Sequence, residues 1–279
     1  MTALRLRSFL FCPAVRPELL EKGVRSGADA VVLDLEDGVS TERKHEGRAF
    51  AGASIAALPA DARSATLLIR INPVDSPYFD DDISSLPTGV HGVVVPKVED
   101  PTQVAAVRSR LEARSAIVVL GIETVVGVRR IDEILGVGAD AVYFGAEDYI
   151  EDLGGRRTTA GLEVLHARSE VAMSARVHGV TPIDQAVVEI RDDDRFRSDA
   201  STGRSLGYRG KICIHPAQVK LANSAFAPTA DEVDRARRLL EAFELAVADG
   251  RAVIEVDGRV VDGPVVRAAR AVLAAHHDD

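Results

Sequence analysis

The sequence predicts an α/β protein, namely a (β/α)8 TIM barrel followed by a C-terminal helix-hairpin-helix extension. Short segments rich in Val, Ile and Leu alternate eight times with longer amphipathic segments, which is the pattern of βα units. The short segments are almost continuously apolar, as expected of parallel strands covered on both faces. The length of 279 residues suits either one large α/β domain or two small ones, and single barrels often reach it. The chain contains neither GxGxxG nor GxxxxGKS/T, whereas an open doubly wound sheet more often carries a glycine-rich first turn.

The expected strands follow one another along the first 215 residues. They are residues 6–12, 29–35, 66–71, 92–96, 116–122, 141–146, 186–190 and 211–215. Several of the intervening helices are marked by their ends. Residues 16–27 have Pro17 near the start and Gly27 after the last turn, and residues 100–112 open on Asp100 and Pro101.

The pattern changes after the eighth strand and the helix expected at 217–226. A capped helix is expected over 229–250, a hairpin over 253–261 around Asp257 and Gly258, and a last helix from Pro264. We therefore expect two parts, a barrel catalytic domain of residues 1–225 and an extension of residues 226–279. The extension lies outside the complete barrel, and we expect it to pack on an adjacent subunit.

Composition and charge exclude several classes of protein. The formal charge of −9 and the pI near 5.3 oppose nucleic-acid binding, which needs a basic surface. No apolar run reaches the length of about 18 residues that a membrane span requires, and the N-terminus does not resemble a signal peptide. Cys12 and Cys213 have no zinc or disulfide spacing and are expected to be buried thiols. We therefore expect a cytoplasmic enzyme.

Ionisable residues, together with one asparagine, gather where six of the expected strands end, which is where a barrel of this kind carries its catalytic groups. They are Asp34, Glu36, Asp37, Arg70, Asn72, Lys97, Glu99, Glu123, Glu147, Asp148 and His215. A carboxylate after a strand often caps the next helix, and Asp37 and Glu99 fit that interpretation. Glu123 does not, because Thr124 can cap the helix in its place.

Two carboxylates at neighbouring strand ends are typical of Mg²⁺, which keeps several waters and takes one or two protein oxygens. Glu123 and one member of the Glu147–Asp148 pair would supply them, since consecutive residues of an extended segment face opposite ways. No His or Cys cluster competes for zinc or iron, and no GxSxG is present. His215 is either catalytic or a buried structural histidine. A Schiff base at Lys97 or Lys211 is less favoured, because acidic neighbours would keep Lys97 charged.

Nine segments in order along nearly the whole chain carry a family resemblance. They are RSFLFCPAVRPELLEKG, DAVVLDLEDGV, LLIRINP, GVVVPKVE, GIETVVGV, YFGAEDYIEDLG, HARSEVAMSARVHG, GKICIHPAQV and DGRVVDGPVVRAAR. The chain thus resembles the citrate lyase β-subunit-like proteins of the HpcH/HpaI aldolase superfamily. The resemblance implies a Mg²⁺-dependent barrel, a homotrimer or hexamer, that joins or cleaves the bond between an acyl-CoA thioester enolate and a 2-oxo acid.

The resemblance also implies roles for individual residues. Glu123 and Asp148 match metal ligands, and Arg70 matches the arginine that binds the enolate or oxo-acid oxygen. The backbone of Ala146 and Glu147 matches the segment that holds the substrate carboxylate.

Further matches surround these positions. Glu36 and Asp37 match acids near the metal waters, and Arg16 and Lys22 match residues that meet CoA phosphates. Asp262 matches an acid that reaches a neighbour's active site for proton transfer; without the resemblance it would be interpreted as a turn residue. Ala14 stands where the family usually has glycine, which alters either the thioester site or only a turn.

The resulting hypothesis is a Mg²⁺-dependent carbon–carbon lyase acting on a citramalyl-, malyl- or citryl-CoA type of thioester. One alternative is a non-catalytic homologue that binds the metal, oxo acid or acyl-CoA. Another is a lyase subunit that acts on an acyl-carrier-protein thioester.

Overall fold

The computed structural model describes residues 5–59 and 65–277 and contains a closed barrel of eight parallel strands. The strands pair in sequence order, and β1 closes the barrel against β8. The (β/α)8 prediction is therefore confirmed. The strands are β1 (Ser8–Pro13), β2 (Ala30–Asp34), β3 (Thr66–Arg70), β4 (Gly92–Val95), β5 (Ile117–Ile122), β6 (Ala141–Phe144), β7 (Thr181–Asp184) and β8 (Gly210–Cys213).

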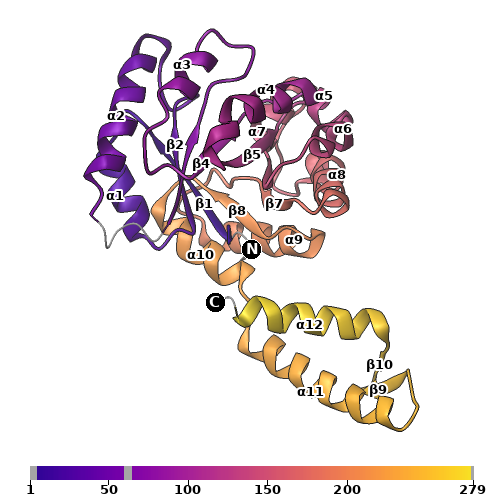
Figure 1. Cartoon of the computed structure of the whole chain (residues 1–279). Helices are drawn as coiled ribbons and strands as arrows, with labels where there is room; N and C mark the ends of the chain where they lie inside the picture. The colour runs from indigo at the N-terminus through magenta and orange to yellow at the C-terminus, as the bar shows by residue number, and fades with distance from the viewer. Residues whose placement is uncertain (1–4, 60–64, 278–279) are drawn as a thin grey trace. The chain divides into compact units, whose positions relative to one another are not determined.

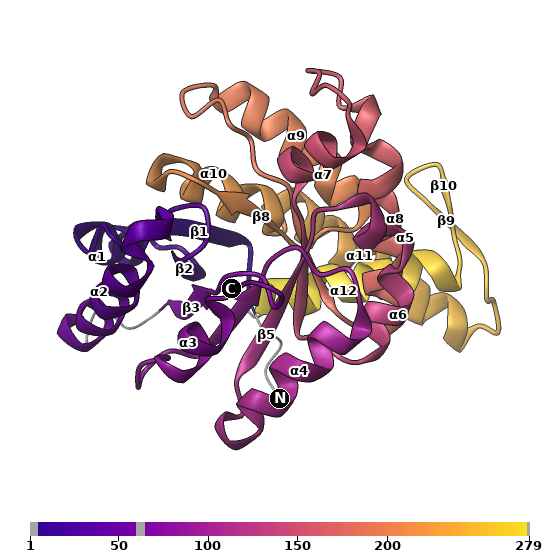
Figure 2. The same ribbon diagram turned by 90° about the horizontal axis from the view of Figure 1, so that it is seen from above.

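Helices alternate with these strands and surround them (Figures 1 and 2). They are α1 (Glu18–Arg25), η1 (Thr41–Arg43), α2 (Lys44–Ala57), α3 (Phe79–Ser84), α4 (Pro101–Leu111), η3 (Glu112–Arg114), α5 (Val125–Arg129), α6 (Ile131–Gly136), α7 (Ala146–Leu153), α8 (Leu162–His178), α9 (Asp193–Leu206) and α10 (Pro216–Phe226). The expected cap of α4 is present, because Asp100 and Gln103 form a capping box on either side of Pro101, the first residue of the helix.

The seventh strand was predicted at the wrong place. Strand β7 is Thr181–Asp184, and residues 186–190 form the loop that follows it. Pro182 hides the strand from a sequence search because proline lacks the N–H of a ladder bond, yet its carbonyl still accepts from Arg209. Two apolar residues of the loop, Val188 and Ile190, are exposed, whereas Val187 is buried.

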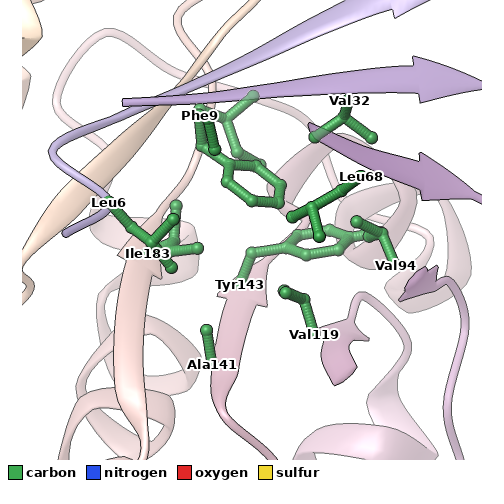
Figure 3. Close-up of a cluster of buried hydrophobic side chains, with 11 residues drawn as sticks. Leu6, Phe9, Val32, Leu68, Val94, Val119, Ala141, Tyr143 and Ile183 are labelled. Atoms are coloured by element: carbon green, nitrogen blue, oxygen red, sulfur yellow. The ribbon is translucent and has the colours of Figure 1, made fainter. Parts of the chain in front are cut away.

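The inside of the barrel is filled by alternate residues of its strands. Tyr143 reaches from β6 towards Leu68 and Val94 on the far side of the cluster (Figure 3). The cluster comprises Leu6, Phe9, Ala30, Val32, Leu68, Val94, Val119, Ala141, Tyr143, Ile183 and Ile212. Because side chains alternate along a strand with a period of two, the next inward positions on β2, β3 and β5 fall at the carboxyl end of the barrel.

A buried ion cluster lies outside β7 and β8, where α8 and α9 pack. Arg168 of α8 forms a two-bond pair with Asp184, at 2.8 and 2.6 Å, and also contacts Asp199 of α9. Lys211 Nζ lies 2.8 Å from Asp184 Oδ2 and 2.7 Å from the carbonyl of Gln185. All four charged side chains of the cluster are buried. Lys211 is thus engaged in ion pairs, which disfavours a Schiff-base role.

The chain divides into two compact units, Met1–Ser224 and Ala225–Asp279. In the second unit α11 (Ala230–Ala248) and α12 (Gly263–His277) lie side by side, joined through the hairpin of β9 (Ile254–Val256) and β10 (Arg259–Val261) (Figure 1). Asp257 and Gly258 both have positive φ, as a two-residue hairpin turn requires. Packing of this unit on an adjacent subunit stays a prediction. Within residues 5–59 and 65–277, none of the helices is long and apolar enough to cross a membrane.

Candidate active site

The inward register of the strands brings charged side chains to the carboxyl end of the barrel. On β2 the inward series runs from Val32 to Asp34, and on β3 from Leu68 to Arg70. On β5 the series Val119 and Gly121 continues to Glu123, which directly follows the strand. The alternation that fills the core therefore also directs these groups into the barrel mouth.

Asp34 and Arg70 form a two-bond ion pair across β2 and β3. Arg70 Nε and Nη2 each lie 2.7 Å from an oxygen of Asp34, and the guanidinium stacks on the Phe11 ring at 4.9 Å. Asp34 also accepts the backbone N–H groups of Glu36 and Gly38. Asp34 thus fixes both Arg70 and the loop after β2. Asp34 was expected at the rim of the barrel but was given no role. The register of β2 against β3, which sets Asp34 opposite Arg70, is the signal that indicates the pair.

A second cation joins this cluster at the end of β4. Lys97 Nζ lies 2.7 Å from Glu36 Oε1 and 3.5 Å from Asp148 Oδ1. The other oxygen of Glu36 lies 2.8 Å from Arg70 Nη1, but at an angle that makes no hydrogen bond, so it accepts none from the described residues. Burial raises the pKa of Glu36, while Arg70 and Lys97 oppose the rise. Glu36 is therefore held between two cations, through an ion pair with Arg70 and a hydrogen bond from Lys97.

Glu123 is the most deeply buried acid of the mouth. Its Oε1 accepts from Tyr143 Oη at 2.9 Å and from the backbone N–H of Lys97 at 2.7 Å. Side chains at Gly121 or Gly145 would collide with Glu123 or Tyr143, so both glycines leave the space that these groups occupy. Burial, followed by the charges of Glu36 and Asp148, raises the pKa of Glu123 to about 7. Thr124 caps α5, as expected, and leaves Glu123 for another role.

Glu147 and Asp148 lie in the first turn of α7 and not on an extended segment, so the reason given for separating their roles was wrong. They are nevertheless separated, because residues adjacent in a helix project about 100° apart. Glu147 pairs with Arg157 at 2.9 Å, whereas Asp148 faces Lys97. The first N–H groups of a helix lack intrahelical acceptors, and Ala146 and Glu147 supply such groups here.

These residues border a cavity of about 300 Å³. Its wall combines the charged groups with an apolar side from β1, the β7 loop and β8. The lining residues are Phe11, Pro13, Asp34, Arg70, Glu123, Tyr143, Gly145, Ala146, Glu147, Asp148, Ala186, Ile212 and Ile214. The structure thus brings the expected residues Arg70, Glu123, Ala146, Glu147 and Asp148 to one pocket. Phe11 and Tyr143 were not anticipated as parts of it.

The HpcH/HpaI aldolase/citrate lyase family matches this chain over residues 7–216. The chain belongs to this family. A citrate lyase subunit beta-like protein of Deinococcus radiodurans is 46% identical over 274 residues, which are 96% of either chain. A (3S)-malyl-CoA thioesterase of Cereibacter sphaeroides is 30% identical, with 96% of this chain and 93% of the relative covered.

A solved structure matches the fold of nearly the whole chain. It is the protein CitE of Mycobacterium tuberculosis in complex with magnesium, acetoacetate and coenzyme A. This chain is 29% identical to it and matches with a TM-score of 0.82, covering 97% of each chain. The resemblance found in the sequence is therefore confirmed, and with it, at the level of the family, the prediction of a lyase.

The acids of the mouth fit a hard divalent cation. Mg²⁺ takes one or two protein carboxylates and keeps several waters, and the carboxylates of Glu123 and Asp148 both line this cavity. Like-charge repulsion from Glu36 and Asp148 contributes to the raised pKa of Glu123. A cation between these acids would relieve that repulsion. Glu123 and Asp148 would hold it.

The remaining expected residues lie apart from this pocket's lining. Asp37 is largely exposed and lies 3.5 Å from Arg70 and 3.9 Å from Lys97. Arg16 and Lys22 are exposed on β1–α1 and α1, and Arg16 pairs with Glu18.

Three further positions have identifiable local roles. Ala14 is buried without positive φ, so its turn does not require glycine. Asp262 precedes α12 in the second unit and accepts from Val265 N–H. His215 is exposed and accepts the Ala217 N–H, so the alternative of a buried histidine was wrong.

The raised pKa of Glu123 predicts a pH dependence of stability in the absence of metal. A carboxyl titrating near 7 when folded and near 4.5 when unfolded binds more protons in the folded state, so this group destabilises the fold as pH rises through that window. Between pH 5 and 8 the ionisation of Glu123 is expected to lower the free energy of unfolding by roughly 2–3 kcal/mol, and Glu123→Gln should remove this decrease. The free energy of unfolding of both proteins can be measured by urea unfolding in EDTA at several pH values. If it changed with pH in the same way in both proteins, the expectation would be contradicted.

Proposed function

We propose that this protein is a Mg²⁺-dependent carbon–carbon lyase that cleaves or forms a 3-hydroxy-acyl-CoA thioester, giving an acyl-CoA and a 2-oxo acid. The observation that carries the proposal is one pocket lined by the two acids Glu123 and Asp148 and by the cation Arg70. Membership of the family, and the magnesium, acetoacetate and coenzyme A in the M. tuberculosis CitE complex, support the same chemistry here.

Each residue has a task in such a reaction. Mg²⁺, when bound, supplies a Lewis acid that lowers the cost of charge on the substrate oxygens. Arg70, held rigidly by Asp34, opposes the negative charge of the enolate. The N–H groups of Ala146 and Glu147 face the substrate carboxylate at a helix N-terminus. Glu36 and Asp37 orient the groups around the metal waters.

Parts of the proposal concern residues outside the pocket. Asp262 of a neighbouring subunit in a homotrimer or hexamer would exchange the proton of the acyl carbon. Arg16 and Lys22 would meet the phosphates of CoA, where two exposed cations suit an anionic ligand in an otherwise acidic protein. We place the enzyme in the cytoplasm, as the sequence predicted.

Three outcomes would favour other functions. A non-catalytic homologue would bind Mg²⁺ and an oxo acid without turning over any thioester, and an acyl-carrier-protein subunit would act only on the protein-bound thioester. A hydrolase is also to be tested, because one relative is a (3S)-malyl-CoA thioesterase. Hydrolysis releases free CoA and a hydroxy acid, whereas carbon–carbon cleavage leaves the thioester on the acyl product.

The test is an assay of citramalyl-CoA, malyl-CoA and citryl-CoA, with acyl-CoA, free CoA and 2-oxo acid measured separately. We expect at least one substrate to yield acyl-CoA and oxo acid in equal amounts. The reaction is expected to stop in EDTA and to resume when Mg²⁺ is added in excess. Full activity in EDTA, or free CoA as the first product, would overturn the lyase proposal.

A further inference from the structure

Lys97 is the only residue of the acidic mouth, among those described, that combines a left-handed backbone with a partly buried ion network. Its φ is +50°, a conformation that costs energy for a residue with a side chain and is retained where surrounding contacts determine it. Its backbone N–H donates to Glu123 Oε1 at 2.7 Å. The unusual backbone thus places this N–H on a proposed metal ligand.

The ammonium of the same residue contacts the other acids. Nζ lies 2.7 Å from Glu36, 3.5 Å from Asp148 and 3.9 Å from Asp37. Lys97 therefore contacts both proposed ligands, one through its backbone and the other through its side chain.

The other cation of the mouth does not duplicate this role. Arg70 makes two bonds to Asp34 and further ion contacts with Glu36 and Asp37, and no ion pair joins it to Asp148 within the described part of the chain. The carboxylate of Asp148 is thus neutralised locally by Lys97. A divalent cation on Asp148 would lie close to this ammonium, and like charges at such separations repel strongly in a partly buried site.

We propose that Lys97 is a positioning residue that serves as the counter-cation of Asp148 in the metal-free protein and sets the Mg²⁺ affinity of the site. This inference rests on the proposed function, because it needs Glu123 and Asp148 to be the metal ligands. The backbone N–H of Lys97 fixes Glu123 Oε1, and the ammonium limits how tightly the ion binds. The site then holds Mg²⁺ in an exchangeable way.

The test is a calorimetric titration with MgCl₂, without substrate and at fixed ionic strength, of the wild type, Lys97→Met, Lys97→Gln and Lys97→Arg. Lys97→Met and Lys97→Gln are expected to bind Mg²⁺ at least about tenfold more tightly, and Lys97→Arg within about threefold of the wild type. Lys220→Met, which removes an exposed lysine of α10, is the control for a change in net charge. It should leave the affinity unchanged.

Thermal unfolding supplies a second measurement. Without metal, Lys97→Met is expected to have a lower Tm than the wild type, and saturating Mg²⁺ should raise its Tm by more. A merely structural lysine would give the opposite result for affinity, because a damaged site binds its ion more weakly. If the wild type binds Mg²⁺ and both neutral variants bind it equally or more weakly, the inference is overturned but the proposed function is not. No Mg²⁺ binding by the wild type would overturn both the inference and the proposed function.

Discussion

Asp148→Ala is expected to abolish Mg²⁺-dependent cleavage, whereas Glu147→Ala should retain most of it. The Asp148 carboxylate lines the pocket and lies 3.5 Å from Lys97, so its removal takes away one of two proposed metal ligands. The Glu147 carboxylate instead pairs with Arg157, and its backbone N–H survives the substitution. We expect kcat/KM to fall by at least about 10³-fold for Asp148→Ala and by less than about tenfold for Glu147→Ala.

The neighbouring pair makes the comparison sharp, because both variants remove a carboxylate from the same helical turn and change the net charge equally. Glu123→Gln serves as a second ligand variant and should resemble Asp148→Ala. Steady-state kinetics over a range of MgCl₂ concentrations would distinguish weakened metal binding from lost chemistry. Equal losses at positions 147 and 148 would show that the two acids do not divide their roles as proposed.

Most of the barrel was predictable because local sequence and fold agree. Seven strands were found as continuous apolar runs, since each is buried on both sides. The prediction failed only for β7. Thr181 and Pro182 of this strand give a weak strand signal, whereas the apolar loop that follows gives a strong one. Pairing with β6 and β8 forms this strand, and such pairing is not visible in a local pattern.

The sequence predicted which charged residues lie at the site, but not which ion pairs and hydrogen bonds join them. Glu123 was identified because Thr124 was available as the helix cap, and the structure shows that cap. The Asp34–Arg70 pair depends on strand register, and the Tyr143–Glu123 bond depends on the close approach that Gly121 allows. The second contact of Lys97, through its backbone, requires a positive φ that the sequence does not reveal in a lysine.

Replacement of Lys211 by methionine is expected to give the largest loss of stability of any single change considered. Lys211 is completely buried and neutralises Asp184 and Asp199 together with Arg168. Removing one member of a buried ion cluster leaves an uncompensated charge and typically costs 3–5 kcal/mol. We therefore expect the free energy of unfolding, measured by circular dichroism in urea, to fall by about 3–5 kcal/mol.

The matched control is Arg25→Met, which breaks an exposed pair with Glu21 one helical turn away. That change should cost no more than about 0.5 kcal/mol, so equal losses for the two variants would contradict the role assigned to the buried cluster.

The Lys211 variant should also affect the pocket. Lys211 donates to the carbonyl of Gln185, and the next residue, Ala186, lines the cavity. Loss of this bond is expected to raise KM more than it lowers kcat, because Ala186 borders the cavity and has no side-chain group that could take part in the reaction.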